Sequence, residues 1–155
     1  MASVVDTPEE DWNSIIAINL KGAAMGCKHA IPMMVENGGG AIVNNASINA
    51  LVALSGADAY TAAKGGIVAL TRVLAVDWGV NGVRVNCLCP GGVDTPMIAP
   101  AIADEQILGF MQESTPLGRL ARPEEIARVA LFLAPDEASY MNGAIVPVDG
   151  GWTAR

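Results

Sequence analysis

The stretch "AIVNNASINALVALSGADAYTAAKGG", residues 41–66, decides the fold class because it joins a strand to a helix. Ala41–Ser47 is apolar and β-branched and ends in polar residues, which predicts a short buried strand. From about Ala57 the sequence becomes rich in alanine, and we expect a helix that continues to about Trp78. A buried strand followed by a helix is typical of a crossover unit in a parallel sheet.

The alternation of strands and helices continues toward the C-terminus. "GVRVNCLCPGG", Gly82–Gly92, predicts a second strand that ends in Pro-Gly-Gly. Residues 93–120 predict an irregular stretch with one or two short helices, and Pro123 opens a further helix to about Ala134. Ala144–Gly151 predicts a last strand and a glycine turn. The predicted architecture is α/β with a parallel sheet, in a single domain over residues 1–155.

The N-terminal segment predicts a long helix. Thr7 is expected as the N-cap, with Pro8 at the first helical position and a glutamate that completes a capping box. The helix should continue to about Glu36, with a kink or a new turn at Pro32. The glycines of Asn37–Gly40 then end it.

Composition and charge exclude several classes of protein. The chain has 155 residues, 52 % of them apolar, and a net charge of −7 with scattered basic residues, which argues against nucleic acid or an anionic membrane as partner. No uninterrupted apolar run approaches about 20 residues, and the acidic N-terminus is not a signal peptide. We therefore expect a cytoplasmic protein. The cysteines lack metal-ligand spacing and His29 lies in an apolar helical pattern, so we expect no metal site, and core roles for Cys27, Cys87 and Cys89.

The candidate chemistry lies in Tyr60 and Lys64, which are four residues apart and therefore share one face of the predicted helix. A cation close to a phenol favours the phenolate, so Lys64 is expected to lower the pKa of Tyr60 and make it a general acid/base near neutral pH. A polar pair on a solvated face is the alternative. Ser47 favours the first interpretation, because it ends a buried strand thirteen residues before Tyr60, and ligands of open α/β sheets bind beyond the carboxyl ends of the strands.

A serine at a strand end, thirteen residues and then Tyr-x-x-x-Lys resembles the short-chain dehydrogenase/reductase family, which has a Rossmann-type doubly wound parallel sheet. Three further motifs agree with this resemblance over essentially the whole chain. They are "AINLKG" around Asn19, "VRVNCLCPGGVDTPM" from the second strand onward, and the C-terminal pair "PLGRLARPEEIA" and "GAIVPVDGG". By this resemblance, the chain corresponds to a partial Rossmann fold of about three C-terminal strands with flanking helices.

The resemblance implies an NAD(P)-dependent oxidoreductase that interconverts a secondary alcohol and a ketone. Tyr60 would be the general acid/base, Ser47 would polarise the substrate oxygen, and Lys64 would lower the pKa of Tyr60 and bind the nicotinamide ribose. Asn19 would hold a water of the proton relay to Lys64, although a helix-interior asparagine can instead bond nearby backbone. The expected cofactor-binding residues are Tyr60, Lys64, Pro90, Gly91, Val93 through its backbone, and Thr95.

The family's cofactor fingerprint, Gly-x-x-x-Gly-x-Gly, does not occur in this sequence. "NGGG" precedes a strand and cannot present a helix N-terminus to a pyrophosphate. We therefore expect the chain to correspond to the C-terminal 60 % or so of a family member, to leave the strand Ala41–Asn45 as an uncovered edge, and to bind NAD or NADP poorly alone. Three hypotheses follow: a truncated product of an oxidoreductase, a non-catalytic half-domain that oligomerises through its edge, or a catalytic half that a separate N-terminal chain complements.

The segment after Thr95 is expected to set the specificity for a small alcohol or ketone. Its apolar residues suggest a lid over the substrate, or equally the packing of a small lobe; they are Met97, Ile98, Ile102, Ile107, Leu108, Phe110 and Met111. Oxoacyl-carrier-protein reductases and dehydrogenases of cyclic alcohols, diols, sugars and steroids all share these motifs. A homo-oligomer, dimer or tetramer, is also expected, and the small residues Ala59, Ala63 and Gly66 would suit either that interface or the sheet.

Overall fold

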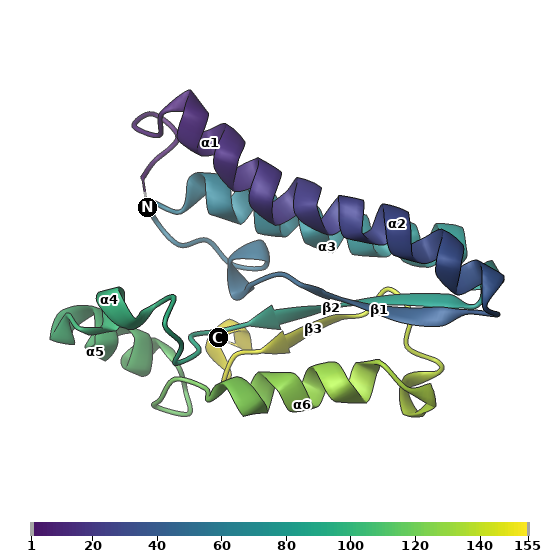
Figure 1. The fold of residues 1–155 in the computed structure, drawn as a ribbon. Helices are drawn as coiled ribbons and strands as arrows, with labels where there is room; N and C mark the ends of the chain where they lie inside the picture. Colours follow the sequence, from purple (N-terminus) through teal and green to yellow (C-terminus); the bar gives the residue numbers. More distant parts are fainter. Residues whose placement is uncertain (1, 155) are drawn as a thin grey trace.

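The computed structural model, which describes residues 2–154, is built on a parallel sheet of three strands (Figure 1). The strands are β1 (Gly40–Asn45), β2 (Val83–Pro90) and β3 (Ile145–Val148), in the spatial order β1-β2-β3. The register places Gly40 opposite Val83 and Cys87 opposite Ile145. The predicted α/β class, with about three parallel strands and flanking helices, is confirmed.

One helical arm precedes the sheet, and it contains α1 (Glu9–Ile16), a π-helical turn (Ala17–Lys21) and α2 (Gly22–Glu36). The predicted capping box is wrong, because Pro8 is the N-cap and the Thr7 hydroxyl donates to the carbonyl of Ser3 at 2.7 Å. The helix continues to Glu36, as expected, and includes Pro32, where the expected kink or new turn stays a prediction. The backbone changes its hydrogen bonding at the π-helical turn, which is a geometry that often marks functional sites.

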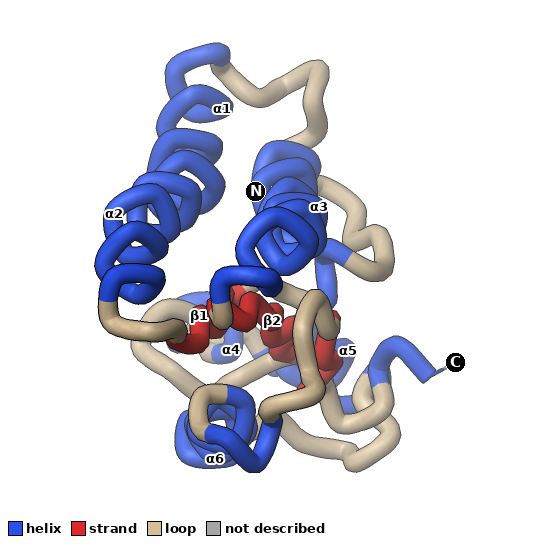
Figure 2. The backbone as a smooth tube through the Cα atoms, turned by 90° about the vertical axis from the view of Figure 1, so that its right-hand side faces the viewer, coloured by secondary structure: helices blue, strands red, loops and turns tan. Residues whose placement is uncertain are grey.

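The helices cover both faces of the sheet (Figure 2). On one face lie α2 and the long α3 (Asp58–Trp78), and on the other lies α6 (Pro123–Leu133). Two hydrophobic clusters fill the space between the sheet and α2 and α3. Their buried members are Cys27, Ile31, Ala75, Val83 and Val85 in one, and Ala46, Ile67, Val68, Cys87 and Cys89 in the other.

The small residues of α3 take part in this internal packing. Ala59 and Ala63 are buried, and a Cβ added at Gly66 would lie 2.7 Å from a methyl of Leu20 in the helical arm. This face of α3 therefore packs inside the chain, as one of the two sequence-based interpretations expected. The helical segment of residues 58–81 is long and apolar enough to span a bilayer by length and composition, but six residues of α3 are buried in the core.

The C-terminal third forms a small lobe and a covering helix. The lobe contains α4 (Ala99–Ile102) and α5 (Glu105–Ser114), which lie beyond the carboxyl ends of the strands (Figure 1). Short 3-10 turns follow α6 and β3, at Asp136–Ala138 and Trp152–Ala154. Among the described residues β1 pairs only with β2, so the predicted open edge at this strand is present in the structure.

Candidate functional site

Ser47, Tyr60 and Lys64 come together at the carboxyl end of β1. Ser47 follows this strand and caps a 3-10 turn (Ile48–Ala50), because its hydroxyl accepts a hydrogen bond from the amide of Asn49 at 3.2 Å. Tyr60 lies in the first turn of α3, close enough to Ser47 for that side chain to act on the pKa of the phenol. Lys64 follows one turn later, with Nζ 5.5 Å from the centre of the Tyr60 ring. The spacing of thirteen residues thus places a hydroxyl, a phenol and an ammonium at the carboxyl end of the sheet, which is where ligands of open α/β sheets bind.

Lys64 is held by the backbone of the strand. Its ammonium donates to the carbonyl of Asn45 at 3.1 Å, and within residues 2–154 this is the only hydrogen bond recorded for it. No ion pair joins Lys64 to a carboxylate in this part of the chain. An ammonium has three N–H donors, so two remain for hydroxyl groups of a ligand. Sequence reasoning missed the Asn45 carbonyl, because a backbone acceptor leaves no pattern in side-chain spacing.

Burial dominates the proton affinities of this site. It raises the pKa of Tyr60 above its usual value of about 10, and the hydrogen bond with Ser47 acts in the opposite direction. Burial also lowers the pKa of Lys64. Burial and Ser47 account for the direction of this pKa shift in Tyr60, and the expectation that Lys64 lowers the pKa stays a prediction.

Two buried thiols lie beneath Lys64 on β2. Cys87 and Cys89 occupy alternate positions and point to the α3 side of the sheet, where both are fully buried. The interaction between the two thiols lowers the pKa of Cys87 and raises that of Cys89. Negative charge on either sulfur would raise the pKa of Lys64, against the effect of burial. All three cysteines are free and buried, as expected from the sequence.

Asn19 lies in the π-helical turn but makes no recorded contact with Lys64 among the described residues. Its side-chain amide donates to the carbonyl of Ile15 at 3.1 Å, which is the local backbone bond that the sequence allowed as an alternative. The relay role of Asn19 stays a prediction. His29, expected in a structural role, is exposed on α2. No group of three or more His, Cys, Asp or Glu residues in the described part of the chain could hold a metal ion.

The expected nicotinamide segment leaves the end of β2 and passes close to β3. The amide of Gly91 donates to the carbonyl of Val148 at 3.1 Å, and a Cβ at Gly91 would lie 2.9 Å from the Cα of Asp149. Val93 forms a bridge with Ala121, and the carbonyl of Thr95 accepts the amide of Ile98 at 3.1 Å. This close approach fixes the backbone from Pro90 onward at the carboxyl end of the sheet, where Ser47 also lies.

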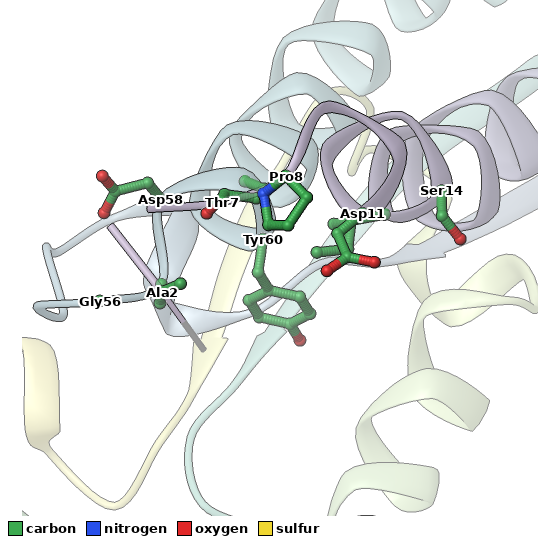
Figure 3. Close-up of a pocket in the computed structure, with 11 residues that line it drawn as sticks. Ala2, Thr7, Pro8, Asp11, Ser14, Gly56, Asp58 and Tyr60 are labelled. Atoms are coloured by element: carbon green, nitrogen blue, oxygen red, sulfur yellow. The ribbon is translucent and has the colours of Figure 1, made fainter. Parts of the chain in front are cut away.

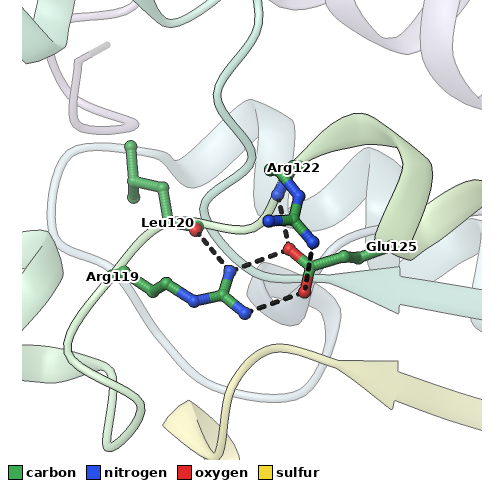
Figure 4. Close-up of polar contacts among 4 residues, drawn as sticks. All are labelled: Arg119, Leu120, Arg122 and Glu125. Atoms are coloured by element: carbon green, nitrogen blue, oxygen red, sulfur yellow. Dashed lines mark hydrogen bonds and ion pairs between the residues drawn. The ribbon is translucent and has the colours of Figure 1, made fainter.

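Asp149 follows β3 at the carboxyl end of the sheet and has a structural role that the sequence motifs did not indicate. Its carboxylate accepts hydrogen bonds from the hydroxyl of Thr153 at 2.6 Å and from the amide of Gly151 at 3.0 Å. Burial alone would raise its pKa, but these hydrogen bonds lower it. A second group of polar contacts is an ion pair, in which the guanidinium of Arg119 donates to both carboxylate oxygens of Glu125 at 2.8 Å (Figure 4). The bonds of Asp149 stabilise the turn after β3, and those of Glu125 join the first turn of α6 to the segment before it.

A cavity of about 220 Å³ opens between the starts of α1 and α3, and Tyr60 forms part of its wall (Figure 3). The N-terminal segment closes one side, because the amide of Val4 donates to a carboxylate oxygen of Asp58 at 2.7 Å. Sequence reasoning did not locate this cavity, since it depends on how the N-terminal segment folds back onto α3. The cavity therefore lies beside Tyr60, the residue that the sequence predicts as the general acid/base.

Comparison with known proteins agrees with this fold. A family model described as Enoyl-(Acyl carrier protein) reductase matches residues 1–153. The chain is 47 % identical over 143 residues to cis-4-hydroxycyclohexanecarboxylate dehydrogenase of Sinomonas cyclohexanicum, covering 92 % of this chain and 57 % of that protein. It is 44 % identical over 152 residues to meso-2,3-butanediol dehydrogenase of Serratia marcescens, covering 98 % of this chain and 59 % of the relative.

A solved structure extends the likeness to three dimensions. The gluconate 5-dehydrogenase of Burkholderia cenocepacia J2315, solved in complex with NADP and tartrate, superposes with a TM-score of 0.97 at 28 % identity. The match covers 99 % of this chain and 60 % of that one. The chain belongs to the short-chain dehydrogenase/reductase family. It spans less than two thirds of the length of the relatives named here.

Proposed function

We propose that this chain carries the proton-transfer part of an NAD(P)-dependent oxidoreductase that interconverts a secondary alcohol and a ketone. The observation that carries the proposal is the convergence of Ser47, Tyr60 and Lys64 at the carboxyl end of β1. The family relationship supports it, since relatives of this chain include alcohol and diol dehydrogenases. In this proposal residues 1–155 correspond to the C-terminal part of the family's Rossmann-type domain.

Each residue has a role that its position supports. Tyr60 exchanges a proton with the substrate oxygen, and the nearby hydroxyl of Ser47 orients that oxygen. Lys64 presents two further N–H donors beside Tyr60, which suit the hydroxyls of a ribose. Asn19, in the π-helical turn of the neighbouring helical arm, would hold a water of the proton relay to Lys64.

NAD or NADP, when bound, supplies the hydride acceptor or donor. The donor set at Lys64 fits the ribose of such a cofactor, and the backbone of Pro90, Gly91, Val93 and Thr95 would hold the nicotinamide end at the same edge. Because the sequence lacks Gly-x-x-x-Gly-x-Gly, these residues would bind only one end of the cofactor. We therefore expect the isolated chain to bind NADH with a dissociation constant weaker than micromolar in a fluorescence titration.

Tyr60→Phe tests the proposal, with Tyr140→Phe as its matched control. Tyr60 and Tyr140 are the two tyrosines of the chain, and Tyr140 is fully exposed. At millimolar cofactor, loss of the Tyr60 hydroxyl should lower turnover of secondary alcohols by about 10² to 10⁴-fold, whereas Tyr140→Phe should leave it unchanged. Equal turnover in the two variants, or no turnover in the unmodified chain, would overturn the assignment.

A second candidate function rests on the open edge of β1. The strand pairs only with β2 among the described residues, and an unpaired edge is a template for another chain. A non-catalytic half-domain that oligomerises through this edge, or a half that a separate N-terminal chain complements, would use it. Exposed Val73, Val76 and Val80 on and after α3 add an apolar surface for a homo-oligomer, dimer or tetramer.

The setting of the proposed enzyme follows from the same features. We propose a cytoplasmic location, a small-molecule alcohol or ketone as substrate, and no role for nucleic acid or membrane. The net charge of −7 and the free, buried cysteines support this proposal. Sedimentation of the purified chain, with and without a proline placed at Val43 on the edge strand, would separate edge pairing from association through the helices.

A further inference from the structure

The cavity beside Tyr60 has features that select among substrates. Its volume of about 220 Å³ is below the roughly 300 to 1,000 Å³ of sites for drug-sized ligands, so it suits a molecule of a few carbons. Ile15 and Ala57 give it apolar walls, and Ser14 adds a hydroxyl from α1. A substrate whose oxygen meets Tyr60 could place its remaining atoms here.

The charged side chains that line the cavity are all acidic. Among the described residues that line it, the only charged ones are Asp11 and Asp58, and no basic side chain is present. Asp58 already accepts the amide of Val4. Asp11 is exposed in the first turns of α1, and in Figure 3 its carboxylate projects to the same side as the Tyr60 ring. Asp11 is therefore the acidic group that a molecule beside Tyr60 would meet.

We propose that Asp11 makes this cavity select uncharged polyols and disfavour hydroxy acids. This inference rests on the proposed function, because it takes Tyr60 as the group that meets the reacting oxygen. A carboxylate accepts charge-assisted hydrogen bonds from substrate hydroxyls. It repels a substrate carboxylate at short range, and no basic residue of the cavity offsets that repulsion. Asp11 is thus a specificity-determining residue, distinct from the residues that transfer the proton.

The test compares two four-carbon probes, D-threitol and D-threonate, which differ in one terminal group: a hydroxymethyl in the first and a carboxylate in the second. Dissociation constants are measured on the 155-residue chain by ligand-observed NMR, without cofactor. We expect threitol to bind at least about fivefold more tightly than threonate, as for one screened charge interaction. Asp11→Asn should remove most of this preference.

Glu10→Gln is the matched control, because Glu10 also lies in the first turn of α1 but does not line the cavity. It removes the same charge and should keep the preference. Equal binding of the two probes by the unmodified chain, failure of both to bind, or equal effects of Asp11→Asn and Glu10→Gln would each overturn the inference. Cofactor-dependent turnover is scored separately, so a retained threitol preference without turnover would count against the proposed function alone.

Discussion

The two faces of β2 are built in different ways. Toward α3 the strand presents Val83, Val85, Cys87 and Cys89, which are fully buried within the two hydrophobic clusters. Toward α6, Arg84 donates to four backbone carbonyls at the end of that helix and after it, and Asn86 bonds the backbone at Met141 and Ala144. The α3 layer packs on the sheet through apolar contacts, whereas the α6 layer combines the buried Leu88 and Leu133 with hydrogen bonds from Arg84 and Asn86 to backbone.

This difference explains where the candidate site lies. Central strands of parallel sheets are usually apolar on both faces, so the polar residues of β2 need partners. The C-terminal end of α6 and the backbone of residues 134–144 supply them. The apolar face ends at Ser47, Tyr60 and Lys64, where burial shifts the pKa of both titratable groups. The α6 face contributes no residue to that cluster. We infer that the α3 layer positions the site while the α6 layer fixes the strand that supports it.

The largest expected effect comes from a cavity in the apolar layer. Ile67 of α3 is only 2 % exposed and belongs to the cluster beneath Lys64. Ile67→Ala should lower the free energy of unfolding by about 2 to 5 kcal/mol, because it removes buried methyl groups and leaves a void. Val76→Ala, at an exposed position of the same helix, should change it by less than about 0.5 kcal/mol. Similar losses in a urea titration would mean that the α3 layer is not packed as described.

The polar layer should respond less, and mainly at Arg84. Its guanidinium lies 2.8 Å from the carbonyl oxygen of Ala134 and 3.0 Å from that of Pro135. Arg84→Ala should cost about 1 to 3 kcal/mol of unfolding free energy, since the carbonyls lose a charged donor. Arg84→Lys should recover less than half, because an ammonium cannot reproduce the planar fork. Full recovery by lysine would show that charge alone, and not the geometry of the fork, holds α6.

The sequence was sufficient for the strands and for most helices because their signals are local. Apolar runs and proline or glycine boundaries predicted β1, β2, β3, α3 and α6 to within a few residues. The failure was at Thr7, whose hydroxyl bonds backward to Ser3 instead of capping α1. The direction of the Tyr60 pKa depends on burial in the folded chain, which no local pattern shows. Arg84 was missed because its partners come from a distant segment, and Asp11 because the cavity that it lines depends on how α1 lies against the start of α3.

A titration of Tyr60 tests whether the apolar layer reaches the site. In Tyr140→Phe, Tyr60 is the only tyrosine, so phenolate absorbance reports it alone. Burial predicts a midpoint above 10. Because the folded-state pKa is raised, the contribution of this group to stability is complete below about pH 10 and is lost as pH rises through the folded-state value. A midpoint below 10 would contradict a site dominated by burial.

Lys64→Met in the same background separates burial from charge. The midpoint should stay above 10, because burial and Ser47, not Lys64, set the pKa of Tyr60 in this structure. If the midpoint instead rises by more than about one pH unit, the ammonium does favour the phenolate, as the sequence first suggested. Circular dichroism of each variant at pH 7 is the control for retained structure.

The smallest effect is expected at the ion pair of the α6 layer, because it is partly exposed. Glu125 accepts two hydrogen bonds from Arg119 and one from the amide of Arg122, and these hold the pKa of its carboxyl at about 2. A folded-state pKa below the unfolded value of about 4.3 means that this stabilisation is present above that pH and is lost as pH falls toward 2. Glu125→Gln should therefore flatten the fall in stability over this acid range, while Glu124→Gln, on the exposed neighbour, should not.

Salt at 1 M should weaken the difference between these two variants, since screening acts on exposed pairs. If Glu125→Gln proves as costly as Arg84→Ala at pH 7, the ion pair and not the capped carbonyls would anchor α6, and the contrast between the two faces of β2 would have to be redrawn around Arg119.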